Sequence, residues 1–207
     1  MEYLINLGIS ILGSAITMFV TYFWKLRHLY EKTKFRDQKA AEKNILDDIS
    51  KSKKMRVYAM CGSTFSDEQY SNIAKKVMGD LKLKQLYLIS DENNKYLEER
   101  QKELPKNAGN LKTKVKNSKN NFDEAQKNNS NIEYRLHNKK VGFRLIILDN
   151  CLYVSQQEKD KFGKNTEIQR IAGDTPAYIN YSEYFDGLWE DNKSKGDAEI
   201  PSSRISS

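Results

Sequence analysis

The sequence predicts an α/β domain, a mixed sheet flanked by helices, that follows one transmembrane helix and a helical stalk. Three observations lead to this prediction. The first two dozen residues are almost entirely apolar. Strand-like and helical patterns then alternate over 55–90. Three further strand-like runs precede an aromatic helix near the end of the chain.

Residues 3–24 form an apolar run without a charged side chain. A helix of this length spans about 33 Å, enough to cross a hydrocarbon core of about 30 Å. Glu2 precedes the run, whereas the basic residues Lys25, Arg27, Lys32, Lys34 and Arg36 follow it. Positive charge stays on the cytoplasmic side. We therefore expect a single-pass protein of the cell membrane with its N-terminus outside and its domain in the cytoplasm, in preference to a cleaved signal peptide.

Composition shifts divide the rest of the chain. Residues 25–50 are predicted to continue as a helical juxtamembrane stalk, because an uneven apolar stripe runs along them. The α/β domain is expected over 51–191. The polar tail over 192–207 has no apolar pattern with which to join a core, and is expected to be disordered.

A strand–helix–strand unit opens the predicted domain. Strands are expected at 55–60 and 85–90, with a helix over 67–81 between them, which favours a parallel pair joined by a crossover. The Lys- and Asn-rich stretch 91–131 reads as helical with a break near Pro105 and Gly109, and its charges are expected to form a solvated face.

Three more strands and a helix are predicted after it. The strands are expected at 132–137, 143–149 and 151–155, with Asp149 and Asn150 in a tight turn between the last two. The unbroken apolar run 145–148 is typical of a central strand covered on both faces. Residues 158–175 read as a loop. Thr175 and Pro176 then open an aromatic helix over 176–191.

The composition bounds the chemistry. The chain of 207 residues has 35 Lys and Arg against 28 Asp and Glu, a net charge of +7. This excess fits nucleic acid, an anionic lipid or a phosphorylated ligand, or else a basic juxtamembrane collar together with a Lys- and Asn-rich composition. Cys61 and Cys151 stand apart, and the two histidines are His28 and His137, so no zinc-type cluster is indicated. No metal and no other cofactor is predicted.

The order of elements, the segment FRLIILDNCLYVS over 143–155 and the aromatic last helix resemble one half of the phospholipase D-like fold. The motif of that family is His-x-Lys, four residues, then Asp. Here Asp149 matches the aspartate, Arg144 stands at the lysine position and Gly142 stands where the nucleophilic histidine belongs. The resemblance therefore implies a degenerate domain without its nucleophile, and no catalytic residue is assigned.

The resemblance also implies where a phosphate would bind. Arg144, Asp149, Ser155 and Ser63 are the candidate ligand-binding or phosphate-binding residues, and an internal ion pair of Arg144 with Asp149 or another carboxylate is the alternative. Because the family is built from paired halves, a homodimer is implied.

The expected function is that of a membrane-anchored, catalytically degenerate sensor or effector that binds a cytoplasmic ligand, a layout found in bacterial signalling and defence. The bilayer is expected as a partner through residues 3–24, whereas nucleic acid is not. A scaffold that docks a partner through Tyr184 and Trp189 of the aromatic helix is the alternative, and an active membrane phosphodiesterase is the third reading.

Overall fold

The computed structural model describes residues 17–22, 33–67, 71–106 and 109–192, and the chain divides into two compact units, 1–32 and 33–207. In the first unit, residues 17–22 are helical, and the Thr21 hydroxyl donates a hydrogen bond to the carbonyl oxygen of Thr17 at 2.5 Å. Met18, Phe19 and Tyr22 are exposed there.

No helix in the described part of the chain is both long and apolar enough to span a lipid bilayer. The prediction of a transmembrane helix over 3–24 is therefore not supported by any described helix. Of that segment only 17–22 is described, and 3–16 and 23–24 lie outside the described residues. The location in the cell membrane, the single-pass topology and the bilayer partner depended on this helix, and no described helix supports them.

Seven strands form one mixed sheet in the second unit, in the spatial order β1-β7-β6-β5-β2-β3-β4. The strands are β1 (Thr33–Phe35), β2 (Lys54–Ala59), β3 (Lys84–Ser90), β4 (Ile132–His137), β5 (Phe143–Ile147), β6 (Cys151–Gln156) and β7 (Ile168–Ala172). β2, β3 and β4 are parallel to one another, and every other neighbouring pair is antiparallel. β5 lies in the middle of the sheet, as its apolar run predicts.

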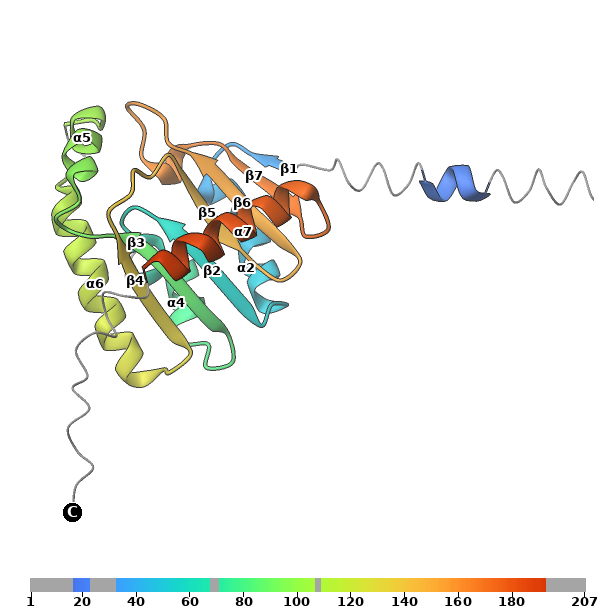
Figure 1. Cartoon of the computed structure of the whole chain (residues 1–207), viewed down its shortest axis with the longest axis horizontal. Coiled ribbons are helices and arrows are strands. Elements are labelled where there is room, and N and C mark those ends of the chain that lie inside the picture. The colour runs from blue at the N-terminus through green and yellow to red at the C-terminus, as the bar shows by residue number, and fades with distance from the viewer. Residues whose placement is uncertain (1–16, 23–32, 68–70, 107–108, 193–207) are drawn as a thin grey trace, which may run out of the picture. The chain divides into compact units, whose positions relative to one another are not determined.

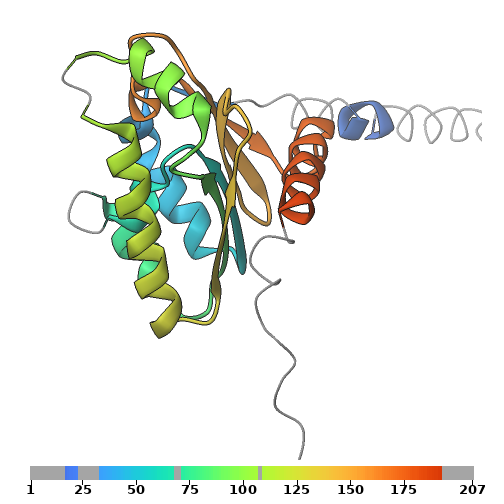
Figure 2. The ribbon, with the colours of Figure 1, turned by 60° about the vertical axis from the view of Figure 1, so that its left-hand side comes forward.

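Helices cover the two faces of the sheet unequally (Figures 1 and 2). One face is covered by several helices, and the other is crossed by α7 (Pro176–Asp191) alone. The several helices are α2 (Gln38–Ser50), α3 (Ser63–Ser66), α4 (Asn72–Met78), α5 (Lys95–Glu103) and α6 (Leu111–Asn128). A 3₁₀ turn, η1 (Gly163–Asn165), precedes β7.

Each main helix has a local reason to begin where it does. The Asp37 side chain caps α2 by accepting from the amide of Ala40 at 2.9 Å, and Asn110 caps α6 by accepting from the amide of Thr113 at 3.2 Å. Thr175 caps α7, and Pro176 occupies its first turn. Along α6 the buried residues recur at helical spacing, so one stripe of the helix faces the core: Leu111, Val115, Ser118 and Phe122.

Two large apolar cores result, one on each face of the sheet, beside a third, minor cluster under α5 and α6. The larger lies under α2, α3, α4 and α6, and includes Ile45, Phe65 and Phe122. The smaller lies under α7 and is formed by Phe185, Leu188 and Trp189 packed on strand side chains such as Leu145 and Leu88. Tyr178 also fixes α7, because its hydroxyl donates to the carbonyl oxygen of Leu148 at 2.7 Å.

Several predicted elements are confirmed. The strand at 132–137, the helix at 176–191, the parallel pairing of β2 with β3 and the helical break between α5 and α6 are all found. The tight turn is confirmed too, since the amide of Leu148 donates to the carbonyl oxygen of Cys151 at 2.8 Å.

Two predicted elements are wrong. The helix expected over 25–50 is not continuous, because among its described residues 33–35 form β1 and 38–50 form α2. The loop expected over 158–175 contains β7, which pairs with both β6 and β1. The tail 193–207 and the residues 25–32 lie outside the described residues, so the domain limits predicted there stay predictions.

Candidate functional site

A cleft opens at one edge of the sheet. β5 runs antiparallel to β2 and β6, so the carboxyl ends of β2 and β6 meet the amino end of β5 at this edge. The cleft has a volume of about 330 Å³. Its lining comes from these strand ends, from α3, from the start of α6 and from the segment 162–164. In open α/β sheets, ligands bind outside the carboxyl ends of the strands.

Gly62 shapes the floor of the cleft, where the chain leaves β2 and enters α3. Its φ is +73°, and a Cβ atom there would lie 2.9 Å from Ile89 Cγ2 and 3.1 Å from Phe122 Cε2. Only glycine fits this close approach with a left-handed backbone. The turn brings the predicted residue Ser63, and its neighbour Thr64, to the cleft.

Arg144, the principal predicted residue, lines the cleft from the amino end of β5. It is half-buried, and its hydrogen bond goes to a neutral acceptor, Gln38 Oε1, at 2.7 Å. Gln38 Oε1 also lies 3.5 Å from Thr64 Oγ1. Burial lowers the pKa of Arg144 to about 10. The expected alternative, an ion pair of Arg144 with a carboxylate, is not found among the described residues.

The other arginines that the structure describes are each paired. Four form ion pairs with carboxylates, and Arg135 lies over the ring of Trp189 with Cζ 4.1 Å from the centroid. The four ion pairs are Arg36–Asp37, Arg56–Asp186, Arg100–Glu103 and Arg170–Asp48. Arg144 is therefore distinct within the described residues, because its charge has neither a carboxylate nor an aromatic ring beside it.

Ser155 lies directly beside Arg144, because the two residues are cross-strand partners in the β5–β6 pair. Its side chain lines the cleft and is 3% exposed, yet its Oγ has no hydrogen-bond partner among the described residues. A buried hydroxyl without a partner costs free energy that a ligand atom can recover.

Three more cationic side chains line the cleft, namely Arg100, Lys114 and Lys164. Arg100 has a structural role, since its guanidinium contacts Glu103 and donates to the carbonyl oxygens of Glu158 and Lys161. It thereby holds the segment after β6 against α5. Among the described residues no aspartate or glutamate lines the cleft, so the potential that these residues create favours anions.

An apolar wall stands beside these polar groups. Met60, Leu104, Leu111 and Phe162 line the cleft and pack into one small cluster with Leu97 and Val115. Lys114 Nζ lies over the ring of Phe162, 4.9 Å from the ring centroid. The cleft therefore offers both cationic and apolar surface to whatever occupies it.

The lining is suited to binding and is poor in catalytic groups. No histidine in the described part of the chain lines it, and burial raises the pKa of the Cys61 thiol to about 12, so this cysteine stays protonated. Gly142 adds no side chain at the position where the resemblance would need a histidine. His137, the last residue of β4, is 1% exposed, and its ring centroid lies 5.1 Å from that of Tyr58. Burial lowers its pKa to about 4.

Asp149 lies apart from the other predicted residues. Five residues along a strand cover about 17 Å, and the turn after β5 places Asp149 at the opposite edge of the sheet. There its carboxylate accepts the amide N–H of Lys53 at 2.7 Å, just before β2 begins. The structure thus brings Arg144, Ser155 and Ser63 to one cleft and leaves Asp149 outside it.

The two candidate docking residues of α7 differ in exposure. Tyr184 is 42% exposed and its ring contacts Tyr58 and Phe143, whereas Trp189 is 7% exposed and stacks on Phe185. Partner docking through this helix stays a prediction.

Sequence reasoning missed Gln38, Lys114 and Phe162. Gln38 and Lys114 lie in helical segments that read as a stalk and as a solvated face, and Phe162 lies in a stretch that reads as a loop. A lone phenylalanine within that polar stretch was the one available signal.

Comparison with known proteins identifies no family. No protein-family profile matches this chain, and no characterised protein matches it by sequence. Among solved structures, the chain is similar to TrmBL2, an archaeal chromatin protein that binds DNA, with a TM-score of 0.48 and 15% identity. The match covers 92% of this chain and 65% of that protein, so this chain spans less than two thirds of its length. Likeness of this degree assigns no function.

These findings correct the resemblance. No phospholipase D-like profile matches, and no transmembrane helix is found in the described residues, so the degenerate, membrane-anchored phospholipase D-like sensor is not supported as fold, family or function. The expectation that nucleic acid is not a partner belonged to that reading and is withdrawn with it. What stands is an α/β unit with a seven-stranded mixed sheet.

Proposed function

We propose that this protein binds a small anionic ligand, such as a phosphate-bearing molecule, in the cleft at the carboxyl ends of β2 and β6. The observation that carries the proposal is the state of Arg144. It is a half-buried guanidinium whose hydrogen bond goes to a neutral amide oxygen and whose neighbourhood contains no carboxylate among the described residues. A buried charge is costly unless it is paired.

An anion in the cleft would supply the missing pair. A guanidinium offers forked donors that match phosphate or carboxylate oxygens. Ser155 supports the same ligand, because its buried hydroxyl beside Arg144 lacks a partner among the described residues. The volume of about 330 Å³ lies at the small end of the range for small-molecule sites.

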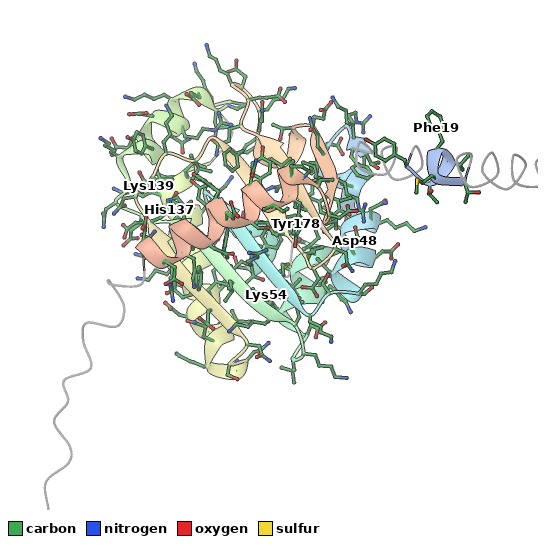
Figure 3. All side chains as sticks on the ribbon, turned by 45° about the vertical axis from the view of Figure 1, so that its right-hand side comes forward. Phe19, Asp48, Lys54, His137, Lys139 and Tyr178 are labelled. Atoms are coloured by element: carbon green, nitrogen blue, oxygen red, sulfur yellow. The ribbon has the colours of Figure 1, made fainter. Side chains whose placement is uncertain are left out.

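Isothermal titration calorimetry of the full chain with pyrophosphate at low salt tests the proposal. The wild type should bind, and Arg144→Gln should raise Kd at least tenfold, because truncating one partner of a buried charge pair costs about 2–5 kcal/mol. Lys54→Gln is the matched control. It removes the same charge from an exposed residue at the amino end of β2, away from the cleft (Figure 3).

The control should bind pyrophosphate as the wild type does. Equal affinity in Arg144→Gln and wild type would overturn the proposal. A similar loss in both variants would do the same, since net charge alone would then account for the binding.

A further inference from the structure

We propose that the ligand carries a planar aromatic ring beside its anionic group, as a mononucleotide does. This inference rests on the proposed function and adds the chemistry of the second half of the ligand. It follows from the apolar wall of the cleft, which an inorganic anion would leave unused.

The polar and apolar linings belong to different parts of the fold. Arg144 and Ser155 come from neighbouring strands, and Arg144 is tied to Gln38 of α2. The apolar wall is formed instead under α5 and α6, where Met60, Leu104, Leu111 and Phe162 pack into one cluster. Both sets line the same cleft. A ligand that satisfies both must therefore be charged on one side and apolar on the other.

The aromatic member of the wall favours a ring over an aliphatic chain. Phe162 is half-buried, so part of its ring reaches the cleft. Aromatic rings pair in offset or edge-to-face arrangements, and stacking of a base on an aromatic side chain contributes about 1–3 kcal/mol. Lys114 Nζ lies 4.9 Å from the centroid of the Phe162 ring, so a cation stands beside the aromatic member of the wall.

The size of the cleft selects a monomeric ligand. A volume of about 330 Å³ suits a small molecule. Glutamine side chains at 156 and 157 line the cleft as well, and they can donate and accept hydrogen bonds to sugar hydroxyls or to the edge of a base.

The test compares three probes by isothermal titration calorimetry of the full chain: AMP, ribose 5-phosphate and adenosine. AMP should bind about tenfold more tightly than ribose 5-phosphate, a difference of about 1.4 kcal/mol. Adenosine should bind more weakly than AMP because it lacks the anionic group. Arg144→Gln should weaken both phosphorylated probes.

Phe162→Leu separates the ring from the phosphate. It should bring the affinity for AMP down to that for ribose 5-phosphate, and leave the affinity for ribose 5-phosphate unchanged. Retained binding of ribose 5-phosphate also shows that the variant is folded.

The outcomes distinguish this inference from the function on which it rests. If pyrophosphate binds but AMP binds no better than ribose 5-phosphate, the inference of an aromatic ring in the ligand is overturned, whereas the proposal of an anion site is kept. Unchanged AMP affinity in Phe162→Leu would also overturn the inference that the ligand carries an aromatic ring. If neither pyrophosphate nor any phosphorylated probe binds, both proposals fail.

Discussion

Two arginines extend from the same face of the sheet toward the same helix, α2, and meet opposite surroundings there. Arg170 of β7 reaches Asp48, with Nε 2.7 Å from Oδ2, and the same carboxylate accepts from Tyr153 and Cys151. Arg144 of β5 donates to the amide oxygen of Gln38, its one hydrogen-bond partner among the residues that the structure describes. One arginine belongs to a complete network, and the other lines a cleft.

Their pKa values differ in direction for this reason. The hydrogen bond to Asp48 raises the pKa of Arg170, whereas burial lowers that of Arg144. Burial opposes ionisation of Asp48, yet hydrogen bonds from Arg170, Tyr153 and Cys151 outweigh it and hold the pKa of this carboxyl below its ordinary value. The comparison teaches that one helix can treat two arginines differently. Asp48 of α2 neutralises the charge of Arg170, whereas Gln38 of α2 accepts a hydrogen bond from Arg144 without neutralising its charge.

Breaking the complete network should have the largest effect. Asp48→Asn (Figure 3) removes the charge that pairs Arg170, and we expect the free energy of unfolding to fall by about 2–4 kcal/mol. Urea unfolding measures it. The neighbouring Asp47 is exposed, and Asp47→Asn should change stability by no more than about 0.5 kcal/mol. Equal effects of the two substitutions would show that the network contributes nothing.

Completing the incomplete pair should come next. Gln38→Glu gives Arg144 a carboxylate of its own, so that it resembles Arg170. We expect the affinity for pyrophosphate to fall at least tenfold, about 1.4 kcal/mol, because the anion then competes with an internal partner. Gln169→Glu adds the same charge on β7 outside the cleft lining and should leave the titration unchanged. An equal loss in both would contradict the pairing.

Removing each arginine separates stability from binding. Arg144→Met replaces an unpaired guanidinium by an apolar side chain of similar length, so the free energy of unfolding should stay equal or rise by about 1 kcal/mol. Arg170→Met leaves Asp48 unpaired and should lower it instead. Thermal unfolding of the two variants measures the difference in stability. A lower melting temperature for Arg144→Met than for Arg170→Met would contradict the view that Arg170, and not Arg144, stabilises the fold.

The smallest effect is expected in acid. The folded pKa of Asp48 lies below its ordinary 3.8. Its contribution to stability is therefore present above pH 3.8 and is lost as the pH falls through the folded pKa. Below pH 3.8 the wild type should lose more stability than Asp48→Asn in urea unfolding at stepped pH. If the free energy of unfolding depends on pH in the same way in both proteins, Asp48 is not the cause of the loss of stability in acid.

The elements that sequence predicted well share a strong local pattern. The run 145–148 is apolar at every position, and it forms the middle of the sheet. Thr175 and Pro176 mark the start of α7. β7 was missed because its sequence, IQRIA, contains a glutamine and an arginine, and the carboxylate that pairs Arg170 comes from a residue 122 positions away.

The sequence names four candidate site residues, and the structure brings three of them, Arg144, Ser155 and Ser63, to one cleft. Arg144 and Ser155 lie side by side because they are cross-strand partners in neighbouring strands. Asp149 lies outside this cleft, because five residues along a strand separate it from Arg144 by most of the height of the sheet. Gln38, Lys114 and Phe162 lie far from Arg144 in the chain, and folding alone places them at the cleft.

The sequence by itself determined the α/β character, the strand–helix–strand unit and the position of Arg144, because hydrophobic periodicity, turn residues and caps act over a few residues. The tertiary structure decided that 33–35 and 168–172 pair as strands, and that α2 offers an aspartate to Arg170 but a glutamine to Arg144. Pairing of a charge is a property of the space around it. Whether an arginine stabilises the fold or remains for a ligand is therefore settled only when distant segments meet.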